Sequence, residues 1–543
     1  MTEEQYNRIS EVCDRLLRRS DSSLERIAIP FLHILNEHPV YLSRYAGLDG
    51  VAASTGLRSS ARDGLGRAVN RGYASAYRAG WLVKNFSRAV RESAGQGKRF
   101  EGKGDMCDAG PGIRNADVVI IAHLVTADHL DQADDFYFGS LQKLLSDRGL
   151  SSHLLLRNQT GQRPSKLFRR ARRDGASSRE LLPDVATVQE ELGFLKRCMG
   201  ARRELRRRAL EASSRLEEQV ARRAGDTAVS GEVAANLRLH GQIREICRRL
   251  RPSIVITLYE GHAWERCVWH AARAAGVPVL CVGYQHTILR RRSHAIKRSL
   301  GHGGLYDPDV ILTVGESTRE VLETRGELGN TRIVTFGTHR RDRGHSPPEQ
   351  PNLIPAFLVL PEGIESECIY LFRYALECAS RLPNVRFIFR THPVLPFERI
   401  ESEVRKFQGI PANVEISRRT PIEADFKRSG YILYRGSSTV IYGILAGLKP
   451  FYVARSDEMS IDPLVGLGHW RENVMSVDDL IERYASQQGS TMEQSMQQWR
   501  NACEFCDSYV QPLNTTAIDE LITLRKQRSI DGAHVVFPPM MSR

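Results

Sequence analysis

The segment that decides the fold spans residues 385–453 and contains two units, each a strand followed by a polar loop. The first, VRFIFRTHP (385–393), is rich in branched and aromatic residues and stops at a proline, which is typical of a strand. The second, YILYRGSSTVIYGILAGLKPFYV (431–453), passes from an apolar strand through a Gly-Ser-Ser-Thr turn into a helix and another strand. Such a turn directs backbone N–H groups and hydroxyls at one point, which predicts a phosphate site.

His392 ends the first unit, and Ser437 and Ser438 lie in the turn of the second. In a parallel sheet the carboxyl ends of the strands meet at one edge, so we expect all three side chains to reach the same crevice. An imidazole there donates a hydrogen bond to a phosphate oxygen as charge builds on a leaving group. The alternative is that His392-Pro393 merely ends a strand and the serines cap a helix. Their joint placement favours the phosphate site.

The two motifs resemble the "HP" and "S-S/T" motifs of bacterial transferases that use CMP-activated sialic acid or Kdo. This resemblance implies an α/β protein of the GT-B fold, in which two Rossmann-like domains face a cleft, and an enzyme that needs no metal or separate cofactor. It also implies that the histidine and the serines hold the donor's CMP phosphate. The predicted donor-binding residues are His392, Gly436, Ser437, Ser438 and Thr439, with Arg390 and Arg435 as bidentate contacts for a donor carboxylate or phosphate.

A second informative stretch, YEGHAWE (259–265), follows the apolar strand predicted at 253–258. A carboxylate at the carboxyl end of a strand projects into a cleft, where its pKa is tuned for proton abstraction. The stretch resembles the D/E-D/E-G motif whose acid activates the acceptor hydroxyl in bacterial sialyltransferases. Tyr259 replaces the first acid, so only Glu260 carries over as the base. Glu265 is a rival, and Glu260 as the N-cap of the next helix is the alternative.

Two further candidates follow later strands. Gly283-Tyr-Gln-His286 looks like the "GxQH" segment of surface-carbohydrate transferases, which makes His286 a second candidate for acceptor activation or phosphate contact. The alternative is a histidine that only satisfies loop carbonyls. Glu362 is a third acid candidate, because the first loop of a GT-B donor domain commonly approaches the donor. The segment Gly337-Thr-His-Arg340 is similar to the "G-S-x-R" that closes the first domain in this group.

The chain of 543 residues is too long for one core, and its pattern predicts two Rossmann-like domains after a helical extension. The predicted order is a helical module at 1–92, a linker at 93–115, an acceptor domain at 116–340 with a helical insertion at about 184–250, a linker at 341–352, a donor domain at 353–510, and a C-terminal helix and tail at 511–543. Chains of this fold often finish with a helix that crosses back onto the first domain.

The formal net charge of +13 favours anionic partners. No RNP, KH or zinc-finger pattern accompanies the basic runs KLFRRARR (166–173) and RRELRRR (202–208), so we expect no nucleic-acid partner. The chain starts without a signal-peptide pattern and its longest apolar stretch, near 118–125, is too short to cross a bilayer. We therefore expect a cytoplasmic protein, whose basic patches suit peripheral association with the inner membrane. The pair Cys503 and Cys506 lacks the second pair that a zinc site requires.

The sequence thus predicts a transferase of surface-polysaccharide synthesis that moves a ulosonic acid, Kdo or sialic-acid-like, from a CMP-sugar to a hydroxyl of a glycan or lipid-linked glycan. His392 and the serines would hold the donor, and Glu260, with His286 as rival, would take the acceptor proton. Three alternatives stay open at this point. They are a CDP-alditol phosphotransferase, an NDP-hexose transferase of the same fold, and a non-enzymatic anion- or nucleic-acid-binding protein.

Overall fold

The computed structural model describes most of the chain. The described residues are 3–36, 39–49, 115–162, 166–167, 179–289, 296, 299–341, 348–392, 395–406, 409–417, 421–456, 458–487, 489 and 491–531. The second half of the predicted helical module and nearly all of the predicted linker at 93–115 lie outside these residues.

The first domain is built on a seven-stranded sheet in which every pairing is parallel. Its order is β3-β2-β1-β4-β5-β6-β7. The central strands are runs of buried apolar residues, as expected where helices cover both faces. The order reverses at β1, and ligands of open α/β sheets bind at such a switch point, here the carboxyl ends of β1 and β4. The strands are β1 (Val118–Leu124), β2 (Ser152–Asn158), β3 (Arg179–Leu181), β4 (Ile254–Leu258), β5 (Leu280–Gln285), β6 (Val310–Thr313) and β7 (Arg332–Thr335).

The second domain repeats this plan with a six-stranded parallel sheet of order β10-β9-β8-β11-β12-β13. Its order reverses at β8, which lies between β9 and β11. The predicted units of the 385–453 segment are therefore strands on either side of β8. The strands are β8 (Ala356–Leu360), β9 (Arg386–Phe389), β10 (Val414–Ile416), β11 (Tyr431–Tyr434), β12 (Lys449–Val453) and β13 (Glu472–Val474).

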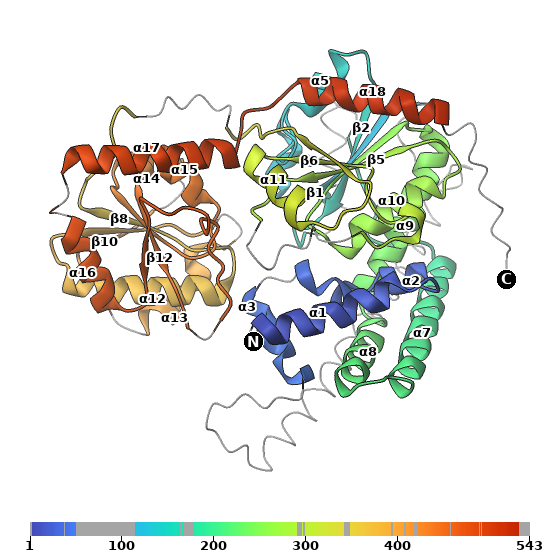
Figure 1. Cartoon of the computed structure of the whole chain (residues 1–543), viewed down its shortest axis with the longest axis horizontal. Coiled ribbons are helices and arrows are strands. Elements are labelled where there is room, and N and C mark those ends of the chain that lie inside the picture. The colour runs from blue at the N-terminus through green and yellow to red at the C-terminus, as the bar shows by residue number, and fades with distance from the viewer. Residues whose placement is uncertain are drawn as a thin grey trace, which may run out of the picture.

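Helices connect the parallel strands and cover the sheets, and Figure 1 shows the two domains side by side. In the first domain they are η3 (Ala127–Leu130), α5 (Leu141–Ser146), α9 (Gly231–Leu250), α10 (Ala263–Arg273), η4 (His302–Gly304) and α11 (Glu316–Arg325). In the second they are α12 (Glu365–Arg381), η5 (Phe397–Arg399), α13 (Glu401–Arg405), α14 (Ile422–Lys427), α15 (Thr439–Leu445) and α16 (Val477–Gln487). The predicted fold class, two Rossmann-like domains with an N-terminal helical extension, is confirmed by these two sheets.

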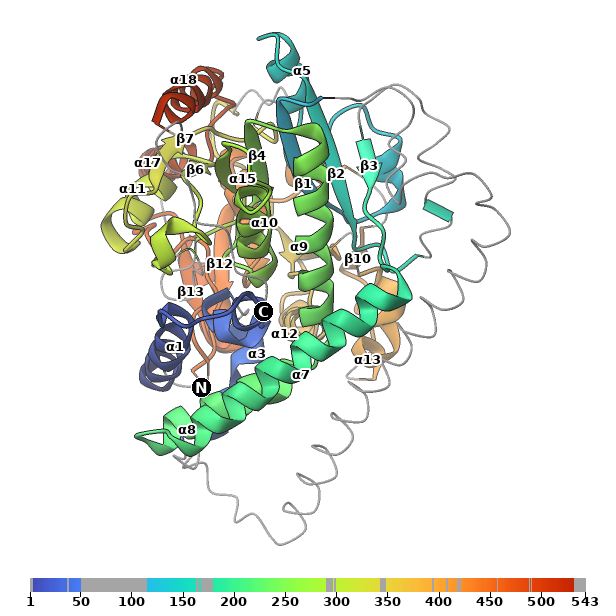
Figure 2. The same cartoon turned by 90° about the vertical axis from the view of Figure 1, so that its right-hand side faces the viewer.

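The N-terminal helices pack against a helical hairpin and form a second hydrophobic core with it. Figures 1 and 2 show this group below the first sheet. Arg26 is fully buried there, donates to the carbonyl of Leu16 over 3.1 Å and pairs with Glu204 of the hairpin. The predicted insertion at 184–250 therefore divides, because only the hairpin joins the N-terminal helices, whereas α9 leads into β4. The elements are α1 (Glu3–Arg18), α2 (Leu24–Ile27), η1 (Pro30–Asn36), α3 (Pro39–Leu42), η2 (Ser43–Asp49), α7 (Val188–Leu210) and α8 (Arg215–Thr227).

The C-terminal helices α17 (Met492–Tyr509) and α18 (Thr516–Asp531) join the two domains. The indole of Trp499 on α17 donates to the carbonyl of Ile444 in the second domain over 2.7 Å. Beyond α17, Gln511 donates its N–H to Val314 over 2.9 Å and its carbonyl accepts from Thr338 over 2.8 Å, both in the first domain. We call residues 507–514 the strap. Helix α18 then buries apolar side chains and lies against β5 of the first domain.

Two details of the predicted boundaries change. The end of the predicted linker at 341–352 belongs to the second domain, because the side-chain amide of Asn352 donates to the carbonyl of Ser429 over 2.7 Å. The apolar run VPVLCV (277–282) before Gly283 predicts a strand from Val277, whereas β5 begins only at Leu280 and continues to Gln285. No helix in the described ranges is both long and apolar enough to span a bilayer.

Gly337 tests the contact between the strap and the first domain. It has φ of +83°, and a Cβ added there would overlap the carbonyl of Pro512 in the strap. We expect Gly337→Ala to lower the free energy of unfolding by about 2–4 kcal/mol, through backbone strain and this overlap. Gly149→Ala is the matched control, since Gly149 has φ of +72° but open space around its Cβ position. It should cost about 1–2 kcal/mol. Urea unfolding measures both, and equal losses would contradict the close approach of the strap.

Candidate functional site

Glu265 shapes the loop that follows β4. Its carboxylate accepts the backbone N–H groups of Glu260 over 2.9 Å and of Gly261 and His262 over 2.8 Å each. This carboxyl group is fully buried, and burial raises its pKa to about 7. Glu265 is therefore the capping carboxylate at the start of α10. The expectation that Glu265 rivals Glu260 as the catalytic base is corrected, because Glu265 is buried and holds the loop. The alternative that Glu260 caps this helix is corrected as well.

Glu260 lies between two imidazoles. Its carboxylate is 3.0 Å from Nε2 of His262 and 3.1 Å from Nε2 of His286, which directly follows the adjacent strand β5. Burial favours a higher pKa for Glu260, but the hydrogen bonds and charges of the two imidazoles outweigh it and hold the pKa well below its usual range. Burial lowers the pKa of His262, whereas Glu260 raises it, and the net shift is upward. The two predicted candidates for proton transfer, Glu260 and His286, are thus in direct contact.

Aromatic and basic side chains from neighbouring strand ends extend this group. The ring of Tyr137 packs edge-on against His286 with 4.8 Å between ring centres. The ring centre of His123 in β1 lies 6.3 Å from that of Tyr137. His123 also packs against Trp264 at 5.1 Å, and the guanidinium carbon of Arg157 in β2 lies 4.3 Å from the Trp264 ring centre. Sequence reasoning missed His123 and Arg157. Their signal is a basic residue directly after an apolar run within a strand.

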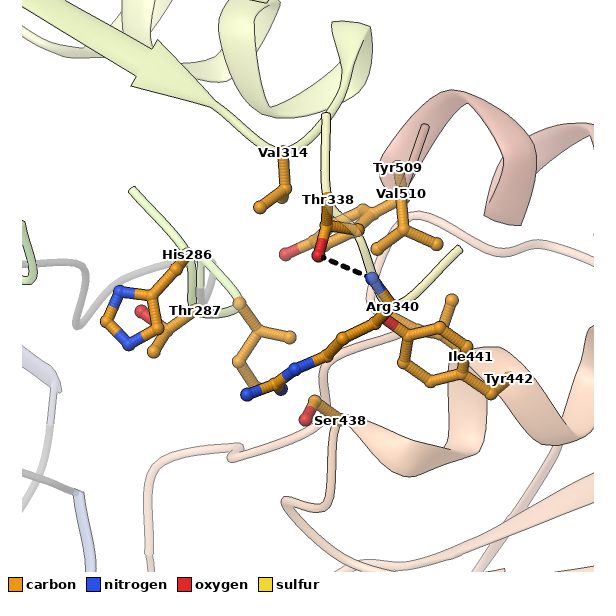
Figure 3. Close-up of a pocket in the computed structure, with 11 residues that line it drawn as sticks. His286, Thr287, Val314, Thr338, Arg340, Ser438, Ile441, Tyr442, Tyr509 and Val510 are labelled. Atoms are coloured by element: carbon orange, nitrogen blue, oxygen red, sulfur yellow. Dashed lines mark hydrogen bonds between the residues drawn. The ribbon is translucent and has the colours of Figure 1, made fainter. Parts of the chain in front are cut away.

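A pocket between the two domains connects this group with the second domain. Figure 3 shows its lining, in which the side chain of Arg340 extends between His286 of the first domain and Ser438 of the second. The hydroxyl of Thr338 accepts the backbone N–H of Arg340 over 3.4 Å. The strap closes another part of the wall. The lining residues are His286, Thr287, Ile288, Val314, Thr338, Arg340, Ser438, Ile441, Tyr442, Tyr509 and Val510.

Arg340 supplies positive charge at this pocket. Its guanidinium lies 4.8 Å from the ring centre of Phe136, and it forms no ion pair with any carboxylate in the described part of the chain. Burial lowers the pKa of the His392 imidazole, Glu362 raises it, and Arg340 lowers it further. Arg340 therefore acts electrostatically on the second domain as well. The sequence singled out this arginine only as part of the motif that closes the first domain.

The predicted donor residues of the second domain follow three adjacent strands, as the parallel sheet requires. Glu362 follows β8, His392 follows β9, and the 436–439 turn follows β11. Gly436 packs against the Glu362 carboxylate so closely that an added Cβ would overlap it. Ser437 is buried and Thr439 begins α15, whereas the exposed Ser438 lines the interdomain pocket. Of the predicted residues, His286 and Ser438 meet at this pocket.

The two arginines expected to contact a donor are engaged within the protein. Arg435 is fully buried, donates to the carbonyl of Val453 over 2.6 Å and pairs with Glu367 over 2.5 Å and also with Glu458. This geometry gives it a structural role in place of the expected ligand contact. Arg390 forms a 2.6 Å ion pair with the buried Asp425. Its guanidinium is accordingly directed to its own domain.

The remaining predictions concern metal ligands and basic runs. Across the residues with described positions, no group of three or more His, Cys, Asp or Glu side chains is placed to hold a metal ion. Cys503 and Cys506 lie on α17, where burial raises the pKa of Cys503 to about 12. Several arginines of the 202–208 run form ion pairs within the helical module. These pairs are Arg202 and Arg206 with Asp226, Arg207 with Glu211, and Arg208 with Glu204 and Asp21.

Comparison with known proteins yields similar structures only. No family model and no curated protein sequence matches the chain. A glycotransferase of kitacinnamycin is 14% identical, with 76% of this chain and 100% of that chain covered and a TM-score of 0.40. A putative UDP-N-acetylglucosamine 2-epimerase from Listeria monocytogenes is 11% identical, with 78% of this chain and 100% of that chain covered and a TM-score of 0.45. MurG from Acinetobacter baumannii is 10% identical, with 75% of this chain and 99% of that chain covered and a TM-score of 0.41. The fold assignment rests on the strand topology itself.

Substitutions of the two glutamates in the loop after β4 should differ in their effect on the free energy of unfolding. Glu265→Ala removes the acceptor of three backbone N–H groups, and we expect it to cost about 2–4 kcal/mol of unfolding free energy. Glu260→Gln is the matched variant, because its side chain is partly exposed and holds no backbone group. It should change stability by less than about 1 kcal/mol. Thermal and urea unfolding check both, and a larger loss in Glu260→Gln would reverse the assignment.

Proposed function

We propose that this protein is a metal-independent glycosyltransferase of bacterial surface-polysaccharide synthesis. It would transfer a ulosonic acid, Kdo or sialic-acid-like, from a CMP-sugar to a hydroxyl of a glycan or lipid-linked glycan. The observation that carries the proposal is the interdomain pocket, where Arg340 lies between His286 of the first domain and Ser438 of the second. The CMP donor rests on the resemblance of the His392-Pro393 and Ser437-Ser438 segments to transferases of that group.

The donor phosphate is assigned to Arg340, Ser438 and His392. An arginine keeps its charge at all physiological pH values and matches a phosphate with a planar pair of donors. The lowered pKa of His392 keeps its imidazole neutral near pH 7, so it donates one N–H to a phosphate oxygen. The positive charge of Arg340 then offsets the charge on departing CMP, the task that a metal ion performs elsewhere.

The Glu260–His286 pair is assigned to the acceptor. The acceptor oxygen attacks the anomeric carbon of the donor, the bond from that carbon to the phosphate oxygen breaks, and its electron pair leaves with CMP. The hydroxyl proton passes to His286, which lines the pocket. Glu260, with its low pKa, is a weak base, and it instead orients the imidazole and stabilises the imidazolium that forms.

Nucleotide binding tests the donor assignment first. We expect CMP, without metal, to stabilise the protein by about 2.7 kcal/mol at a hundred times its Kd, and UDP and GDP to do so less. Arg340→Gln and His392→Ala should each weaken CMP binding about tenfold or more, because each removes a phosphate contact. Arg399→Gln is the matched control, since Arg399 is exposed on η5 and should leave CMP affinity unchanged. Thermal unfolding and calorimetric titration measure these effects.

The outcomes distinguish the remaining functions. Preference for UDP or GDP would keep a nucleotide-sugar transferase and discard the CMP donor. A CDP preference, with a phosphodiester in the product, would identify a phosphoalditol transferase. No response to any nucleotide, together with steep salt-dependent nucleic-acid affinity, would replace the enzyme with a binding protein.

Turnover tests the acceptor assignment. With a CMP-ulosonic acid donor, His286→Ala should lower kcat about 10²–10⁴-fold, the usual contribution of a general base. Glu260→Gln should lower it less, because the imidazole remains but is less well oriented. Release of CMP in a coupled assay gives both rates. Near-wild-type turnover of His286→Ala would remove the histidine from the mechanism.

A further inference from the structure

A basic and aromatic group at the carboxyl ends of β1 and β2 is not used by the steps above. Arg157 of β2 stacks on Trp264 of α10, and His123 of β1 packs edge-on against the same indole. The charges of Arg157, Glu260, His262 and His286 all act on His123, whose pKa is lowered first by burial. The group is therefore continuous with the Glu260–His286 pair. We call Arg157, His123 and Trp264 the basic subsite.

Two nitrogens of the basic subsite have no hydrogen-bond partner among the described residues. Nη1 of Arg157 and Nδ1 of His123 are buried, and neither has a hydrogen-bond partner in the part of the chain that the structure describes. No carboxylate of that part forms an ion pair with Arg157, and Glu265 and Asp184 act on it only through space. Burial lowers the pKa of Arg157 to about 10, so it stays charged at neutral pH. A buried cation without an anion is costly, and such groups are normally paired.

The surrounding carboxylates do not supply that anion. Glu265 is fully buried and holds three backbone N–H groups. Glu260 is shared by two imidazoles, one of which, His262, has a raised pKa. Neither carboxylate therefore forms an ion pair with Arg157. The side chains of Glu260 and His262 are 33% and 36% exposed, so the carboxylate–imidazole pair beside the group is open to solvent.

We propose that the basic subsite binds an oxyanion, a carboxylate or a phosphate, carried by the acceptor glycan. Arg157 takes the oxyanion by charge-assisted hydrogen bonds, and His123 supplies a further donor. The acceptor class is then an acidic sugar or a phosphorylated sugar. The oxyanion subsite stands on its own contacts, whereas its assignment to the acceptor rests on the proposed function of the adjacent Glu260–His286 pair.

Three probes test the subsite: glucuronate for a carboxylate sugar, inorganic phosphate, and glucose as the neutral control. Calorimetric titrations use the full chain carrying Arg340→Gln, which removes the donor-site cation from the measurement. We expect glucuronate or phosphate to bind and glucose not to bind. Adding Arg157→Met should lower the affinity for the probe that binds at least tenfold. Arg157→Lys, which keeps a charge, should lower this affinity less. The probe that binds better identifies the oxyanion as carboxylate or phosphate.

A second substitution keeps the test decisive where Arg157→Met disturbs folding. His123→Phe retains an aromatic ring against Trp264 and should weaken the same probe severalfold. Binding of neither oxyanion, or affinities unchanged by both Arg157→Met and His123→Phe, would overturn the proposal. The test is separate from that of the donor site, because CMP affinity is measured with Arg340 intact. If CMP binds but no oxyanion binds in an Arg157-dependent way, the oxyanion subsite is wrong and the CMP-transferase proposal stands. If an oxyanion binds in an Arg157-dependent way but CMP does not bind, the CMP-transferase proposal is wrong and the subsite stands.

Discussion

One buried carboxylate determines the geometry of the acceptor side. Glu265 binds the three consecutive backbone N–H groups of residues 260–262 and so fixes the turn between β4 and α10. Because the turn is satisfied internally, the side chain of Glu260 is not needed for capping and lies between His262 and His286. A fully buried acid with a raised pKa is a costly way to hold a loop, and here it lies beside Glu260, whose pKa is held well below its usual range.

The rest of the site follows from the parallel sheets. All thirteen strands of the described ranges pair in parallel, so each sheet directs the loops after its strands to one edge. In the first domain this edge carries His123, Glu260 and His286, and in the second it carries Glu362, His392 and Ser438. Arg340 and the strap lie where these edges meet. The site is thus a product of topology, since its residues are spread over more than half of the chain.

Much of the fold was predictable because buried parallel strands are continuous apolar runs. The apolar stretch near 118–125 and the strands predicted at 253–258 and 431–434 correspond to β1, β4 and β11. The three-residue edge strands β3, β10 and β13 could not be predicted, since so short a segment carries no periodicity. At the site, Glu260 and Glu265 are both acids near one strand end, and only the hydrogen bonds distinguish them. Arg435 likewise fits a ligand contact by its position in the sequence, but it is buried in an ion pair with Glu367. Sequence alone does not give a side chain's partners.

The strap has a mechanical consequence for the cleft. Trp499 fixes α17 to the second domain, while the strap backbone and α18 are fixed to the first. Only the six residues between Tyr509 and Thr516 connect the two helices, and a chain of that length reaches about 20 Å at full extension. Several of these residues are already hydrogen-bonded to the first domain. The tether therefore limits how far the domains swing apart, and it transmits any such opening directly to the pocket wall at Tyr509 and Val510.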